Sequence, residues 1–293
     1  MLIISGGSHP SLAQQVATQI KVELILANSQ KFNDQEFKVQ IQKNLYQEDV
    51  VIFQSTSNPV NDHLMELLLI ADTAKRAGAK KIIAVMPYFG YSRQDRKSYE
   101  YGPISASLIA SLIEASGIDE VITIDLHSKQ SEGFFKINIQ NLDAVELFAH
   151  YFKNTKNSIV VSPDVGGLDR AQKFANILGC EVALINKIRV QSGCCVMNDV
   201  NGDVTNKHCI LIDDIVDTGN TLYQAVQLLR KKGAKSFDAC ITHSVFSKSA
   251  LNKLERSGFN RVYITDTIKQ NYLPDNIQII SVSKIIAEDL IRL

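Results

Sequence analysis

The stretch that most constrains the fold of this chain is residues 209–222, CILIDDIVDTGNTL. Its short apolar run, residues 210–212, predicts a buried strand of a parallel sheet. After a polar turn, apolar residues recur at helical spacing, at Leu222, Ala225, Val226 and Leu229. This spacing predicts an amphipathic helix. The chain therefore passes from a buried strand, through a polar loop that contains glycine, into a helix.

This loop has the composition of an anion-binding site. Two adjacent acids, Asp213 and Asp214, precede a turn made of Asp217, Thr218, Gly219, Asn220 and Thr221. Free backbone N–H groups, the helix dipole and the Thr hydroxyls all favour a phosphate there. Carboxylates repel phosphate, so the acid pair indicates a ligand whose hydroxyls need acceptors, or bound Mg²⁺. A sugar phosphate satisfies both requirements, whereas helix capping by Asp217 or Thr218 does not explain the pair.

A second loop of the same kind lies at residues 162–171, SPDVGGLDRA. Gly166 and Gly167 allow the backbone to approach an anion closely, and Asp164 is a candidate ligand of Mg²⁺. Two anion loops in one half of the chain fit a sugar that carries phosphate at both ends.

Strand and helix patterns alternate along the whole chain, which favours an α/β fold with mainly parallel sheets. The order repeats, so we expect two domains, residues 1–145 and 146–293, each with a mainly parallel sheet flanked by helices. The predicted strands are 2–4, 24–27, 37–41, 50–53, 82–87, 121–125, 159–162, 181–185, 210–212, 237–242, 261–265 and 277–282. The other predicted helices begin near Pro10 or cover 61–77, 103–115, 143–152, 167–177 and 284–293. The last of these helices is a candidate to dock on the first half.

The composition argues against several classes of protein. Of 293 residues, 45% are apolar and 21% charged, and the formal net charge is zero, so no broad attraction to nucleic acid or an anionic membrane is expected. No apolar run approaches the roughly 20 residues that span a bilayer. The start, MLIISGGSHP, lacks the basic region of a signal peptide. Five Cys without a CxxC pair indicate reduced thiols, so we expect a cytoplasmic protein.

Three other segments carry charged or metal-binding residue types. Residues 91–97, YSRQDRK, follow a predicted strand at the end where α/β sheets bind ligands. Arg side chains there can clamp phosphate or stack on a purine. Residues 31–36, KFNDQE, combine an aromatic with two acids, and residues 125–127, DLH, end a strand. By themselves, these segments are explained as well by a solvated charged loop, a surface turn and a histidine without a ligand.

Together the segments resemble a known family. Residues 209–222 resemble the phosphoribosyl-diphosphate loop of the phosphoribosyltransferase fold, and both halves of the chain are expected to be phosphoribosyltransferase-like domains. Within that fold, PYFGYSRQDRK resembles the ATP-binding segment of ribose-phosphate diphosphokinases. DLHSKQSEGFF and SPDVGG resemble the metal segment and the pyrophosphate loop of these enzymes, and NKIR preserves their catalytic Lys-x-Arg. Five motifs agree in order over nearly the full chain.

The resemblance implies a reaction and its residues. The 1-hydroxyl of ribose 5-phosphate would attack the β-phosphorus of ATP with Mg²⁺ present, giving phosphoribosyl diphosphate and AMP. Ribose 5-phosphate would bind at Asp213, Asp214 and residues 217–221, and pyrophosphate at Asp164, Gly166 and Gly167. The implied ATP-binding residues are Phe32, Asp34, Glu36, Arg93, Gln94, Asp95 and Arg96. The implied metal ligands are His127 and Asp164, and the implied catalytic residues are Lys187 and Arg189.

The same resemblance implies a homo-oligomer, a dimer or hexamer, because the family shares its ATP site between subunits. Lys187 and Arg189 open a polar segment, residues 191–207, whose lack of periodicity predicts a long loop or lid. Two departures leave regulation and chemistry in question. After Lys97, residues 98–102, SYEYG, contain aromatics and an acid where many family members carry additional basic residues that line a site for phosphate activation and ADP inhibition. The segment after Arg189 is also unlike the common pattern.

Two alternatives to the diphosphokinase reading remain open. A phosphoribosyltransferase would share the central loop, but it has no use for the ATP-binding segment. A non-catalytic regulatory homologue would tolerate the altered lid, although Lys187, Arg189 and His127 are intact.

Overall fold

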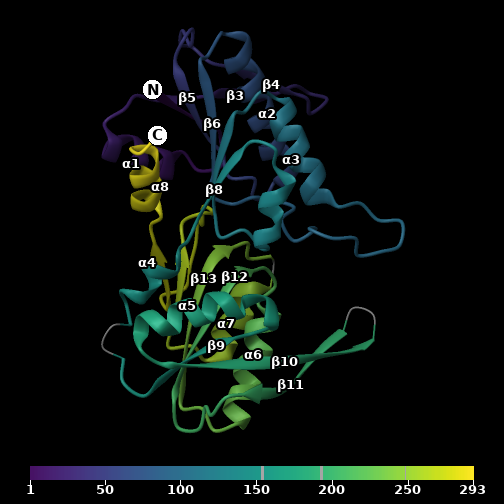
Figure 1. Ribbon diagram of the computed structural model, residues 1–293, viewed down its shortest axis with the longest axis vertical. Coiled ribbons are helices and arrows are strands. Elements are labelled where there is room, and N and C mark those ends of the chain that lie inside the picture. Colours follow the sequence, from purple (N-terminus) through teal and green to yellow (C-terminus); the bar gives the residue numbers. More distant parts are fainter. Residues whose placement is uncertain (153–154, 192–193, 248) are drawn as a thin grey trace. The chain divides into compact units, whose positions relative to one another are not determined.

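The computed structural model describes residues 1–152, 155–191, 194–247 and 249–293 (Figure 1). The chain divides into two compact units. The first unit contains Met1–Leu142, Thr267–Lys269 and Ser281–Leu293, and the second contains Asp143–Asp266 and Gln270–Ile280. The main change of unit lies between Leu142 and Asp143, and the division into residues 1–145 and 146–293 stays a prediction. The last segment groups with the first unit because α8 (Ser283–Leu290) packs against α1 (Pro10–Ile20).

The first unit is built on a six-stranded parallel sheet, in the order β2-β1-β5-β6-β7-β8. Its strands are β1 (Leu2–Ser5), β2 (Leu24–Leu26), β5 (Asp49–Phe53), β6 (Lys81–Met86), β7 (Glu120–Ile124) and β8 (Asn138–Leu142). The central strands are continuous apolar runs because both faces of a parallel sheet are covered. The run VVIF of β5, for example, is fully buried.

Helices cover both faces of this sheet (Figure 1). α2 (Val60–Arg76) and α3 (Ser105–Ala115) share a core with alternate strand residues such as Ile4 and Ile52. On the other face, Gln19 Nε2 of α1 donates to Ser283 Oγ of α8 at 2.8 Å. The unit also contains an antiparallel hairpin, β3 (Asn28–Lys31) and β4 (Phe37–Gln40), and a 3-10 helix, η1 (Lys129–Phe134).

The second unit contains a seven-stranded sheet, in the order β11-β10-β9-β12-β13-β14-β15, in which β11 alone is antiparallel to its neighbour. Its strands are β9 (Ser158–Ser162), β10 (Glu181–Gln191), β11 (Cys194–Asn201), β12 (His208–Val216), β13 (Ser236–Ser244), β14 (Arg261–Thr265) and β15 (Ile277–Ile280). Its helices are α4 (Val145–Ala149), η2 (Val165–Gly167), α5 (Leu168–Leu178), α6 (Asn220–Lys231) and α7 (Ala250–Ser257). The predicted α/β class, with mainly parallel sheets flanked by helices, is confirmed.

Two differences from the predicted elements bear on the site. β12 continues through Asp213 and Asp214 and pairs with β13 as far as Ser244, so the acids lie within the strand and not after it. Residues 194–201, expected within a long loop, form β11, which pairs with an extended β10. β11 lies at the edge of the sheet, where one side of the strand meets water. Its polar residues are therefore tolerated, and no apolar period marks it.

Candidate functional site

The acid pair of β12 lies beside a basic residue from α5. Arg170 Nη1 is 3.4 Å from Asp214 Oδ1 and 3.9 Å from Asp213 Oδ1. All three side chains are mostly buried, with at most 15% of any one exposed. The Asp214 N–H donates to Asp213 Oδ1 at 3.0 Å. Since β12 runs parallel to β9 and β13, this pair stands near the carboxyl ends of three central strands, where ligands of open α/β sheets bind.

Burial and the closeness of the two carboxyl groups disfavour ionisation of the pair. Burial raises the pKa of Asp213 well above its ordinary value, and the charge of Asp214 raises it further. Asp164 adds to this shift, while Arg170 opposes it. Three carboxylates thus act on one region of the second unit. The sequence predicted both the pair and Asp164, and the structure brings them together.

The turn after β12 is fixed by bonds to the chain that follows β13. The Val245 and Phe246 N–H groups donate to the Val216 carbonyl at 3.0 and 3.2 Å, and the Ser247 N–H donates to that of Asp217 at 2.9 Å. These bonds leave the Thr218 and Asn220 side chains exposed at the start of α6. The turn therefore presents hydroxyl and N–H donors to solvent, as a phosphate-binding loop requires.

Gly219 makes this turn possible. Its φ is +72°, in the left-handed region that side chains other than glycine rarely adopt. A Cβ added there would lie 3.1 Å from the Ala250 carbonyl oxygen of α7, so space as well as conformation requires glycine. The Tyr223 N–H donates to the Gly219 carbonyl at 3.0 Å and closes the first helical turn of α6.

The second predicted anion loop follows β9 and is closed by its own acid. Asp164 caps η2, and its Oδ1 accepts from the Gly167 N–H at 3.2 Å. Ser162 Oγ donates to the Asp164 carbonyl at 2.7 Å and fixes the loop from the strand side. Val165 and Gly166 are exposed, so the loop is open to a ligand.

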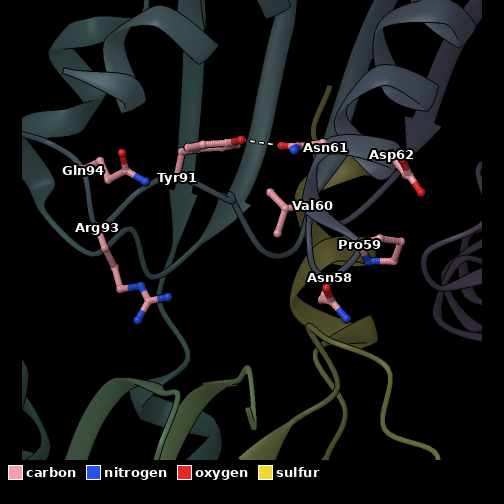
Figure 2. A pocket seen from close by; sticks show the side chains of 8 residues that line it. All are labelled: Asn58, Pro59, Val60, Asn61, Asp62, Tyr91, Arg93 and Gln94. Atoms are coloured by element: carbon pink, nitrogen blue, oxygen red, sulfur yellow. Dashed lines mark hydrogen bonds between the residues drawn. The ribbon is translucent and has the colours of Figure 1, made fainter. Parts of the chain in front are cut away.

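In the first unit, the charged segment 91–97 faces the start of α2 across a cavity of about 510 Å³. Figure 2 shows Tyr91, Arg93 and Gln94 on one side and residues 58–62 on the other, with a hydrogen bond from the Tyr91 hydroxyl to Asn61 Oδ1. Ser105 Oγ of α3 donates to Gln94 Oε1 at 2.7 Å and orients that amide. Asp95 and Arg96 follow in the same segment but do not line the cavity.

The hairpin β3–β4 carries the other predicted ATP residues at its tip. The Phe32 N–H donates to the Glu36 carbonyl at 2.8 Å, and the Glu36 N–H donates to Asp34 Oδ1 at 3.1 Å. The Phe32 ring is 53% exposed, so it is available to stack on a ligand. At the base of the tip, Lys31 Nζ is 2.5 Å from Asp62 Oδ2, which ties the hairpin to the wall of the cavity.

The remaining predicted residues are located less completely. His127 is exposed after β7 in the first unit, whereas Asp164 belongs to the second. The backbones of Lys187 and Arg189 lie in β10, opposite Met197 and Cys195 of β11, but their side chains fall outside the described residues. Within the described ranges, no group of three or more His, Cys, Asp or Glu is arranged to hold a metal ion.

The donor chemistry nevertheless fits Mg²⁺. Mg²⁺ prefers oxygen ligands and is usually held by one or two carboxylates together with substrate phosphates and water. Asp164 offers such an oxygen beside an open anion loop, and its charge also acts on Asp213 of the nearby acid pair. The imidazole of His127 is the less suited donor for this hard ion.

Sequence reasoning missed the residues that complete these sites. Arg170 lies eight residues beyond β9, in α5, and it reaches Asp214 only because of its position on the first turn of that helix. Residues 58–62 connect β5 to α2 and include its first residues, and their sequence alone did not indicate a cavity. The one signal they carried was the polar sequence NPVND directly before the apolar period of α2.

Comparison with known proteins identifies the family. Residues 1–117 match the N-terminal domain of ribose phosphate pyrophosphokinase, and residues 137–275 match the phosphoribosyl transferase domain. The chain is 44% identical to ribose-phosphate pyrophosphokinase of Agrobacterium fabrum, covering 100% of this chain and 96% of the relative. It is 40% identical to the enzyme of the same name from Thermotoga maritima, covering 100% and 95%.

A solved structure agrees with these relatives. The phosphoribosylpyrophosphate synthetase of Mycobacterium smegmatis matches with a TM-score of 0.92 and 34% identity, covering 99% of this chain and 97% of the other. No described helix is long and apolar enough to cross a membrane. The chain belongs to the ribose-phosphate pyrophosphokinase family, whose two phosphoribosyltransferase-like halves correspond to the two sheets described above.

Proposed function

We propose that this enzyme transfers the β,γ-diphosphoryl group of ATP to the 1-hydroxyl of ribose 5-phosphate, which gives 5-phosphoribosyl 1-diphosphate and AMP for nucleotide biosynthesis. The observation that carries the proposal is the grouping in the second unit of an acid pair, Arg170 and two strand–loop–helix turns. An acid pair between two anion loops fits a sugar that has hydroxyls in its middle and phosphates at both ends. The family membership points to the same reaction.

The turn of residues 217–221 binds the 5-phosphate through the donors of Thr218, Gly219, Asn220 and Thr221. Asp213 and Asp214 accept hydrogen bonds from the ribose hydroxyls, and Arg170 holds the two carboxylates in place. The loop of Asp164, Gly166 and Gly167 binds the diphosphoryl group at the other end of the sugar. The sugar is thereby held with its 1-hydroxyl toward the diphosphoryl group, and positioning of this kind lowers the barrier.

In the first unit, Arg93 and Gln94 at the cavity, with Asp95 and Arg96 beside it, bind ATP. Phe32 stacks on a base, and Asp34 and Glu36 accept from its exocyclic amine. The tip of the hairpin is exposed, which fits the proposal of a homo-oligomer, a dimer or hexamer, with the ATP site near a subunit interface. We place the enzyme in the cytoplasm.

Transfer of a phosphoryl group needs charge stabilisation more than covalent help from the protein. Lys187 and Arg189 on β10 neutralise the oxygens of the diphosphoryl group as AMP leaves. Mg²⁺ would supply further neutralisation of the phosphate oxygens, with Asp164 as its proposed ligand in the second unit. His127 of the first unit stays a predicted metal ligand.

The test is AMP release from ATP in the presence of Mg²⁺, with and without ribose 5-phosphate. AMP formed only with the sugar phosphate supports the proposal, and chelation of Mg²⁺ should stop it. ATP binding without any AMP release would instead indicate a non-catalytic homologue. Consumption of phosphoribosyl diphosphate with a free base, and no use of ATP, would indicate a phosphoribosyltransferase.

A further inference from the structure

The two units contain a turn with two adjacent glycines at equivalent places in their sheets. In the first unit, β1 leads through Gly6 and Gly7 into α1, and β1 lies between β2 and β5. In the second unit, β9 leads through Gly166 and Gly167 into α5, and β9 lies between β10 and β12. A strand, two glycines and a helix form an anion-binding loop in either case.

The loop of the first unit already holds an anion. The Gly7 N–H donates to both carboxylate oxygens of Glu66, each at 3.1 Å. Glu66 comes from α2, 59 residues further along the chain, and it is only 3% exposed. A buried carboxylate is costly unless donors surround it, so an acid at this position of an otherwise apolar helix face needs a specific reason.

A second donor completes the surroundings of this carboxylate. Gln54, at the end of β5 and fully buried, donates from Nε2 to Glu66 Oε2 at 2.6 Å. Its Oε1 accepts from the Ser8 N–H, next to Gly7, at 3.1 Å. Among the described residues, these hydrogen bonds of the Glu66 oxygens all come from N–H donors, as suits a carboxylate group.

Hydrogen bonds continue from this group to Tyr88 and Ser57, which precede in sequence the two segments that line the cavity. On one side, Ser8 Oγ accepts from the Ser55 N–H at 2.8 Å, and Ser55 Oγ accepts from the Tyr88 N–H at 3.2 Å. On the other side, Gln54 Nε2 donates to the His63 carbonyl at 3.2 Å. The His63 ring hydrogen-bonds through Nδ1 to the Ser57 carbonyl at 2.8 Å.

The segment that contains Gly90 packs closely against Thr56. The Gly90 N–H donates to Thr56 Oγ1 at 2.6 Å, and a Cβ at Gly90 would collide with the Thr56 carbonyl oxygen. The backbone that carries Tyr91, Arg93 and Gln94 is thus fastened to the chain directly after Gln54. A shift of the Glu66–Gln54 pair would be transmitted to the cavity.

We propose that Glu66 is a built-in anion that fills the Gly6–Gly7 loop and thereby positions the nucleotide-binding segment 87–94. It is a positioning residue, because Gln54 and Ser8 stand between it and the cavity. This inference rests on the proposed function in one respect, the binding of ATP by Arg93 and Gln94. The filled loop itself is independent of that function.

The test removes the Glu66 carboxylate by substitution and then adds a free carboxylate, acetate, to the solution. Glu66→Ala should lower the melting temperature and raise the KM for ATP about tenfold, with kcat changed less than about threefold. Sodium acetate at roughly 100 mM, compared with sodium chloride at equal ionic strength, should restore part of both, because a small carboxylate can enter the vacated loop. Glu66→Gln keeps the shape but turns an N–H₂ group toward donors, so it should raise the KM for ATP as well.

Glu120→Ala is the matched control. Glu120 is also a buried acid of the first unit, 4% exposed, and it is paired with Lys81 Nζ at 2.7 Å and Asn138 Nδ2 at 2.8 Å. It lies at the opposite end of the strands and makes none of the bonds described above. Its loss should lower the melting temperature without changing the KM for ATP.

Equal KM values for ATP in Glu66→Ala, Glu66→Gln and the native protein would overturn the proposal, as would a melting temperature of Glu66→Ala that acetate and chloride shift alike. If Glu66→Ala does not fold, Glu66→Gln alone decides, by its KM for ATP. If the native protein forms no AMP, calorimetric binding of ATP replaces KM. The acetate-dependent melting then still tests the filled loop, while the proposed function fails separately.

Discussion

Gly219 offers the sharpest test of how the backbone of the second unit builds its phosphate turn. In Gly219→Ala, the new Cβ must sit at a φ of +72°, and it meets the Ala250 carbonyl oxygen at 3.1 Å. The left-handed conformation costs about 1–2 kcal/mol for a residue with a Cβ. The close contact requires α7 to move by a few tenths of an ångström, so we expect a total loss of about 1–3 kcal/mol in the free energy of unfolding.

The substitution should also weaken the binding of ribose 5-phosphate. A shift of the turn moves the N–H groups of residues 218–221 away from the 5-phosphate, and we expect the KM for ribose 5-phosphate to rise about tenfold or more. The KM for ATP, whose proposed residues lie in the first unit, should change little. Urea unfolding followed by circular dichroism gives the stability, and AMP release at varied ribose 5-phosphate gives the KM.

Gly179→Ala separates strain from function. Gly179 follows α5 with a φ of +67°, and a Cβ there would meet no heavy atom within 4 Å. The substitution should therefore cost about 1 kcal/mol of conformational strain and leave both KM values unchanged. If Gly219→Ala and Gly179→Ala lose the same stability and neither changes the KM for ribose 5-phosphate, the turn is not the phosphate site.

Three further predictions follow from the site. Because the pKa of Asp213 is raised, the stability that its protonated form contributes is complete below the ordinary Asp pKa and is lost as pH rises through the raised value. Asp213→Asn should therefore melt at a higher temperature than the native protein at pH 7. AMP release by this variant should fall at least about tenfold. Lys187→Ala should bind ATP nearly as well in calorimetry but lower kcat by about two orders of magnitude or more; unchanged turnover would remove Lys187 from the mechanism. Residues 98–102, SYEYG, contain aromatics and an acid where the family resemblance implies additional basic residues of a phosphate-regulated site. AMP release should therefore be the same with and without inorganic phosphate, and strong activation would contradict that expectation.

The elements that apolar periodicity marks were predicted well, and those that it does not mark were missed. β5 and β12 were recognised from runs such as VVIF and ILI, which have no polar face because both sides of the sheet are covered. β3, with the sequence NSQK, is polar and largely exposed, so nothing in its composition distinguishes it from a turn. It exists because its partner β4 packs against α2, a contact made far along the chain.

In the candidate site too, features formed by neighbouring residues were predicted, and contacts between residues far apart in the sequence were missed. Both strand–loop–helix turns of the second unit are local, since each consists of a strand end, a glycine and a helix start, and the sequence was enough to predict these turns. Anion binding by them stays a prediction. Arg170 contacts Asp214, 44 residues away in the sequence, and Lys31 contacts Asp62, 31 residues away. Such pairs depend on the register of helices on the sheet, which no single stretch of sequence records.

The comparison between the two glycine loops explains why one fold can do two different tasks in one chain. At Gly167 the carboxylate that accepts the backbone N–H belongs to Asp164, three residues away in an exposed loop, so a bound anion can replace it by a small local movement. At Gly7 the carboxylate belongs to Glu66, held in a helix and bonded again by Gln54, so replacing it would mean moving α2. The second loop is therefore exchangeable and suits a substrate that must enter and leave. The loop of the first unit is filled by a side chain of its own unit, and on our proposal this filling supports the segment that carries Arg93 and Gln94.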